Sequence, residues 1–76
     1  MEINNNGVIT ETAKRNICLK IVDKGLNRNL LATKAGIPST SFNRKLDHPE
    51  QFTLKDLGSI AQALEIDLTE LFKDAA

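Results

Sequence analysis

The sequence has no tryptophan or tyrosine and only three phenylalanines, so it lacks the row of aromatic rings on which single-stranded nucleic acids stack. Its one cysteine, Cys18, has no partner for an internal disulfide, which fits a reducing compartment. Its one histidine, His48, has no second histidine or cysteine at metal-ligand spacing. We therefore expect a fold without a disulfide, a metal or a cofactor.

Long apolar runs and catalytic groupings are also missing. No stretch approaches the roughly 18 apolar residues of a membrane span, and the N-terminus lacks the apolar core of a secretory signal. No Ser-His-Asp or Cys-His arrangement can be assembled, and there is no glycine-rich phosphate loop. We therefore expect a cytoplasmic protein that is not an enzyme, with no membrane partner and no small-molecule ligand.

Charge is balanced overall but unevenly distributed. The 76 residues carry 10 basic and 10 acidic side chains, and 41% of them are apolar, which suffices for one small domain. Residues 11–24 hold four bases and two acids, whereas residues 50–76 hold two bases and six acids. Such asymmetry indicates a surface that faces a polyanion, and ordinary variation of surface charge explains it equally well.

Two short helices joined by a tight turn are predicted within residues 28–46. Gly36 can adopt the positive φ that ends a helix with a sharp reversal. Pro38 resists continuation of the first helix and pre-sets φ for the start of the second. The predicted helices therefore span residues 28–35 and 39–46.

The apolar residues of these two helices define their inward faces. Leu31 and Ala35 are four residues apart in the first helix, and Phe42 and Leu46 are four apart in the second. The side chains left to point outward from the second helix are Ser39, Thr40, Asn43, Arg44 and Lys45. They are short hydrogen-bonding groups and cations, which suit contact with base edges and phosphates.

Two runs of the sequence carry a resemblance to a known family. Residues 31–46 read Leu-Ala-x-Lys-Ala-Gly-Ile-Pro-x-x-Ser-Phe-x-Arg-Lys-Leu, and residues 52–72 read Phe-Thr-Leu-Lys-Asp-Leu-Gly-Ser-Ile-Ala-Gln-Ala-Leu-Glu-Ile-Asp-Leu-Thr-Glu-Leu-Phe. The first resembles the helix-turn-helix of the lambda-repressor-like family, which includes phage repressors and Cro proteins. The second is similar to that family's fourth and fifth helices. The resemblance covers residues 16–72 and implies an all-α, five-helix DNA-binding domain.

One position departs from the family's pattern. Three residues after the position of Phe42 the family usually has an aliphatic side chain. This chain has Lys45 there, followed directly by Leu46. We therefore expect the second helix of the motif to sit slightly rotated, which changes the assignment of its base contacts.

The other helices are predicted from their caps and apolar spacing. The first begins at Thr10 or Thr12 and ends at Lys24, the fourth begins after its cap Thr53, and the fifth begins after its cap Asp67 and ends at about residue 73. The inward positions predicted for the first and fourth helices are Ala13, Ile17, Ile21, Leu54, Leu57, Ile60, Ala61 and Leu64. Residues 11–74 are expected to form the domain.

The two ends of the chain allow alternatives. Residues 1–10 contain the turn-forming cluster Asn4-Asn5-Asn6-Gly7 and are predicted to be a flexible N-terminal tail or a small hairpin. The short fifth helix packs its apolar side chains into the core, or it leaves Leu68 or Phe72 exposed for a weak homodimer contact through the helix 4–5 region.

The resemblance implies double-stranded DNA as the partner, as a palindromic operator, with residues 39–46 in the major groove. The candidate DNA-binding residues are Arg28, Asn29, Lys34, Ser39, Thr40, Ser41, Asn43, Arg44, Lys45 and His48. The helix dipole disfavours the positive charge of Arg28 at the start of its helix, and an external anion bound there would offset this cost. The alternative for Arg28 and His48 is an ordinary solvated residue.

The predicted function is therefore a sequence-specific transcriptional regulator, a repressor of Cro-like size in a bacterial cell or a phage-infected host. The sequence leaves two alternatives open. One is an antitoxin that represses its own operon. The other is a protein-interaction module on a helix-turn-helix fold, which the zero net charge favours.

Overall fold

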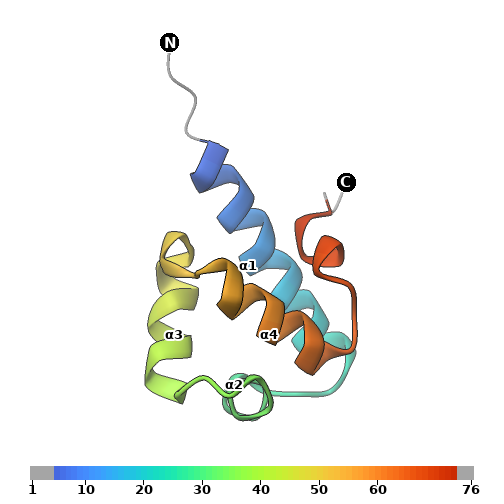
Figure 1. Ribbon diagram of the computed structural model, residues 1–76. Coiled ribbons are helices and arrows are strands. Elements are labelled where there is room, and N and C mark those ends of the chain that lie inside the picture. Colours follow the sequence, from blue (N-terminus) through green and yellow to red (C-terminus); the bar gives the residue numbers. More distant parts are fainter. Residues whose placement is uncertain (1–4, 74–76) are drawn as a thin grey trace.

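A computed structural model describes the backbone of residues 5–73 and the side chains of residues 9–73. Within that range the protein is all-α, with four α-helices, two short 3-10 helices and no strand (Figure 1). The elements are α1 (Asn5–Asp23), α2 (Arg28–Ala35), α3 (Ser39–Asp47), η1 (Pro49–Gln51), α4 (Leu54–Leu64) and η2 (Leu68–Phe72).

The helices surround one core and leave α3 at an edge of the molecule. α4 packs against α2 and η2, and α1 packs against η1 and η2. α3 packs mainly against α2 and η1. In Figure 1, α2 is seen end-on while α3 runs along the picture plane, so the two helices cross steeply. η2 lies on the opposite side of α4 from α3 (Figure 1).

All four α-helices contribute side chains to this core. Its buried apolar residues are Ala13, Ile17, Ile21, Leu31, Ala32, Phe42, Leu46, Phe52, Leu57, Ile60, Ala61, Leu64 and Leu71. The predicted inward residues of α1 and α3 are all buried, and so are those of α4 except Leu54. In α2, Leu31 is buried and Ala35 is half-buried. Phe52 meets Phe42 edge-on, with ring centroids 6.2 Å apart, an arrangement that stabilises aromatic pairs by about 0.5–1.5 kcal/mol.

The turn between α2 and α3 has the predicted geometry. Gly36 has a φ of 73°, and its N–H and that of Ile37 are bonded to the carbonyls of the last turn of α2. Asn27 caps the start of α2 because its side-chain oxygen accepts a hydrogen bond of 2.7 Å from the N–H of Leu30. Local signals therefore determine both ends of α2.

The predicted start of the first helix was wrong. α1 begins at Asn5, five residues before Thr10, so part of the expected tail is helical. Extending an existing helix adds a hydrogen bond for each residue fixed, and Gly7 costs only about 1 kcal/mol relative to alanine. No proline stops the helix in this segment. The remainder of the expected tail, residues 1–4, lies outside the described residues.

Leu54 was also placed wrongly, since 71% of it is exposed. It occupies the first turn of α4, whereas Leu57, Ile60 and Leu64 further along the helix are buried. Apolar spacing identifies the inward face of a helix, but it does not show how far along that face the neighbouring helices extend.

The fifth predicted helix is a 3-10 helix of five residues, η2, with Leu71 buried and Leu68 and Phe72 half-buried against the core. In so short an element most carbonyls have no intrahelical partner. The side chain of Asn16 in α1 supplies a partner for the carbonyl of Leu71 and for that of Lys73 just beyond η2. Its buried Nδ2 donates to them at 2.8 and 2.7 Å. The Asn16 side chain therefore joins α1 to η2 and the residue that follows it.

Phe42→Ala should lower the free energy of unfolding by about 3–5 kcal/mol, because Phe42 is fully buried and its removal leaves a cavity. Leu54→Ala is the matched control, since a largely exposed side chain contributes within about 0.5 kcal/mol. Urea unfolding followed by circular dichroism measures both. A parent-like midpoint for Phe42→Ala would contradict the packing of α3.

Asn16→Ala should lower the free energy of unfolding by about 1–3 kcal/mol, because the carbonyls of Leu71 and Lys73 lose their donor. Asn16→Asp has nearly the same shape but replaces the donor with a carboxylate that faces carbonyl oxygens, so we expect a larger loss at neutral pH. The same urea titration compares the two variants. If Asn16→Asp were the more stable of the two, the Asn16 side chain would not be the donor to these carbonyls.

Candidate nucleic-acid interface

The exposed face of α3 is a stripe of Thr40, Arg44 and Asp47. These residues follow the i, i+4, i+7 spacing of a single helix face, opposite the buried Phe42 and Leu46. The stripe carries a hydroxyl, a guanidinium and a carboxylate. Arg44 is thus the cation on this stripe, and Asp47 places one negative charge near the C-terminal end of it.

Polar side chains flank the stripe. Ser39, Ser41 and Asn43 are half-buried. Asn43 Nδ2 donates a 3.0 Å hydrogen bond to the carbonyl of Ser39 within the same helix. A two-bond contact with adenine would therefore use the second amide hydrogen of Asn43 together with its carbonyl oxygen.

The first turn of α3 begins directly after Pro38 and has no side-chain cap. The leading N–H groups of a helix have no intrahelical partner, so here they remain for water or for an anion. The hydroxyls of Ser39, Thr40 and Ser41 stand at the same end. This end of α3 is therefore rich in hydrogen-bond donors.

The predicted phosphate contacts on α2 are exposed. Arg28 and Asn29 occupy its first turn, and Lys34 occupies its last turn, just before the bend that leads to Thr40. The side chain of His48, at the end of α3, is 60% exposed, and its Nδ1 lies 3.8 Å from a Glu50 carboxylate oxygen. An exposed contact of that length contributes little to stability.

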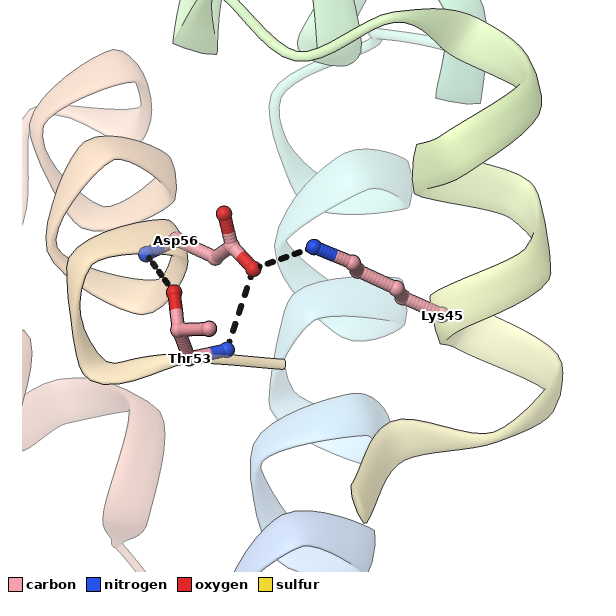
Figure 2. Close-up of polar contacts among 3 residues, drawn as sticks. All are labelled: Lys45, Thr53 and Asp56. Atoms are coloured by element: carbon pink, nitrogen blue, oxygen red, sulfur yellow. Dashed lines mark hydrogen bonds and ion pairs between the residues drawn. The ribbon is translucent and has the colours of Figure 1, made fainter. Parts of the chain in front are cut away.

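Lys45 differs from the other predicted contacts because it forms a largely buried ion pair with another helix. Its Nζ lies 2.7 Å from Asp56 Oδ2 on α4, and the two side chains are only 17% and 16% exposed. Figure 2 shows Lys45 reaching from α3 towards the start of α4, where Thr53 lies beside Asp56. The structure therefore brings Lys45 together with α4 and not with the exposed stripe.

Asp56 is also part of the predicted cap of α4. The N–H of Thr53 donates to Asp56 Oδ2, and the N–H of Asp56 donates to Thr53 Oγ1, both at 3.0 Å (Figure 2). This reciprocal capping box satisfies two N–H groups at the start of the helix. One carboxylate oxygen, Oδ2, thus accepts hydrogen bonds from both α3 and the N-cap of α4.

The environment of Asp56 changes its pKa. Partial burial raises the pKa, but the hydrogen bond from Lys45, those from Thr53 and the charge of Lys45 outweigh burial. The pKa of Asp56 consequently lies below its ordinary value. The ionised carboxylate is the form that holds α3 and α4 together.

The predictions missed two polar contacts. Lys45 was assigned to the outward set although it lies three residues after the buried Phe42, and that spacing was the available signal. Asn16, buried at 8% exposure, gave no signal because its acceptors lie more than 50 residues away along the chain.

Metal sites and membrane spans are absent from the described part of the chain. No group of three or more His, Cys, Asp or Glu side chains there could hold a metal ion. None of the helices described is both long enough and apolar enough to cross a membrane.

Comparison with protein-family models, curated proteins and solved structures found no match for this chain. What the exposed surface of α2 and α3 can bind depends on the chemical groups it presents. These are hydroxyls, amides, one guanidinium and one carboxylate on α3, and a guanidinium, an ammonium and the exposed Leu30 on α2. Hydrogen-bonding groups and cations on a helix at the edge of the fold suit contact with a polyanion whose bases expose hydrogen-bonding edges.

Asp56→Asn should make the protein less stable at neutral pH, on the order of 1 kcal/mol, because the amide keeps an acceptor for Thr53 but loses the ion pair. The pKa of Asp56 is lowered in the fold, so its contribution is present above the unfolded value and is lost as pH falls through the folded value. The stability difference between parent and variant should therefore shrink as the pH is lowered from neutral into the acid range.

Urea midpoints measured across that range test this pH dependence. Asp47→Asn, which removes the same charge from the exposed stripe of α3, is the matched control. If the urea midpoints of the parent and Asp56→Asn differed by the same amount at every pH, the ion pair would not contribute to stability.

Proposed function

We propose that the protein is a sequence-specific regulator that binds double-stranded DNA through α3. In this proposal α2, the turn at Gly36 and α3 act as a helix-turn-helix of the lambda-repressor-like type. The observation that carries the proposal is the position of α3 at the edge of the fold with Thr40 and Arg44 exposed. A single α-helix fits the major groove, where each base pair presents a distinct pattern of donors and acceptors.

The roles follow from where each group stands. Thr40 and Ser39, at the start of α3, would lie closest to the bases. Arg44 has the planar fork that binds guanine O6 and N7 through two hydrogen bonds. Arg28, Asn29 and Lys34 on the exposed surface of α2 would contact phosphates and set the register of the complex.

We further propose a two-fold dimer on a palindromic operator, with a weak contact through the α4–η2 region. Leu68 and Phe72 are half-buried, so part of each side chain remains accessible for such a contact. A dimer would double the number of phosphate contacts and would match the symmetry of the operator.

Two observations favour a second candidate function, a protein-interaction module. Leu19 and Val22 on α1 are 53% and 79% exposed, and the net charge of the chain is zero. An apolar face and a balanced charge suit a protein partner better than a nucleic acid. The two candidates differ in how binding responds to salt.

Salt dependence provides the first test. The affinity for duplex DNA should fall as salt rises, with a log–log slope of about 2 to 3 per protomer if Arg28, Lys34 and Arg44 all displace counterions. The duplex is obtained by selection from a random library, and the affinity is measured by fluorescence anisotropy. No enriched duplex, or a flat salt response, would favour the protein-interaction module.

A second test separates base reading from phosphate contact. Arg44→Ala should weaken binding to the selected duplex by about 1–3 kcal/mol and relax the preference at one base pair. Lys34→Ala should weaken all sequences alike and lower the salt slope by about 1. Lys24→Ala is the control, because Lys24 is exposed just after α1, outside α2, α3 and the α4–η2 region, and should change neither property.

Repeating the selection with the Arg44→Ala variant decides what Arg44 does. An unchanged consensus that is merely bound more weakly would show that Arg44 contacts a phosphate. A relaxed preference at one base pair would show that it reads a base.

A further inference from the structure

We infer that Lys45 is a positioning residue of the proposed DNA interface: its ion pair with Asp56 sets the orientation of α3. Lys45 therefore makes no phosphate contact of its own. The inference rests on the proposed function, because it concerns how the same face of α3 is presented to DNA.

The packing of α3 explains why orientation needs such a restraint. The buried side chains of α3 are Phe42 and Leu46, four residues apart on one line along the helix. A single line of apolar contact keeps a helix from sliding or detaching but resists rotation about its own axis less strongly. Rotation of α3 would move Thr40 and Arg44 together relative to the groove.

Lys45 supplies a contact to one side of that line. It directly precedes Leu46, so it leaves the helix about 100° around the axis from that residue, on the side that faces α4. The 2.7 Å contact with Asp56 consequently acts as a lateral tie between α3 and α4 (Figure 2). Neither Phe42 nor Leu46 can replace it, because both lie on the line itself.

The anchor at the other end is itself held in place. Asp56 Oδ2 accepts from the N–H of Thr53 at 3.0 Å as well as from Lys45, and Thr53 is the N-cap of α4. The carboxylate is therefore oriented by the backbone of a second helix. Its negative charge also lies at the N-terminal end of α4, where the helix dipole favours it.

The same geometry removes Lys45 from the charges available to DNA. Its side chain is 17% exposed, and its ammonium is neutralised by the adjacent carboxylate. Moving it to a phosphate would leave Asp56 ionised and unpaired beside a polyanion, which opposes binding. Lys45 and Asp56 together therefore contribute no net charge and no counterion release.

The experiment compares Lys45→Met, Asp56→Asn and the double variant on the selected duplex, with Lys34→Met as the matched exposed lysine. We expect each single Lys45 or Asp56 substitution to weaken binding about threefold to tenfold. The double variant should bind the duplex no more weakly than the weaker-binding single variant, because both substitutions break the same contact. The salt slope should stay at the parent value for Lys45→Met and for the double variant, which both lack the Lys45 ammonium, whereas Lys34→Met should lower it by about 1.

A second readout separates positioning from a loss of folding stability. Selection from the random library with Lys45→Met, at a temperature where circular dichroism shows it fully folded, should give a relaxed preference at the base pairs that Thr40 and Arg44 face. An unchanged consensus would mean that Lys45 only stabilises the fold, and this would overturn the inference.

The remaining outcomes are also distinct. A salt slope that falls as much for Lys45→Met as for Lys34→Met would show that Lys45 contacts a phosphate, which overturns the inference and leaves the proposed function intact. A parent protein without salt-dependent duplex binding would overturn the proposed function and the inference together.

Discussion

The surface that α3 presents depends on the few contacts that hold it at the edge of the fold. Two apolar side chains, Phe42 and Leu46, bury one line of the helix, and the ion pair of Lys45 with Asp56 ties its flank to α4. In a small domain with one core, contacts of this kind carry a large share of the total stability. The orientation of Thr40 and Arg44 follows from them.

Two polar contacts join elements that are not adjacent in the chain. Asn16 joins α1 to η2, and Lys45 joins α3 to the start of α4. Both use groups that would be costly to bury without a partner, and both have one within 2.8 Å. Buried polar contacts are more directional than apolar ones, so they restrict how the helices can pack.

The balance of charge fits the proposed mode of recognition. Phosphate neutralisation supplies most non-specific affinity for DNA, and this chain has zero net charge, with Lys45 neutralised internally and Asp47 on the exposed stripe. We therefore expect weak non-specific binding. In the proposed complex, discrimination would come mainly from the hydroxyls and the single guanidinium of α3, which would face the base edges.

The sequence by itself determined the elements whose signals are local. The cap at Asn27, the left-handed Gly36 and the paired spacing of Phe42 and Leu46 each act within one or two helical turns, so α2, the turn and α3 could be predicted. Tertiary structure alone decided the partner of Lys45, 11 residues away, and that of Asn16, 55 residues away at Leu71. It also made the last element a 3-10 helix. Those outcomes depend on the packing of the helices around the shared core, which caps and apolar periodicity do not specify.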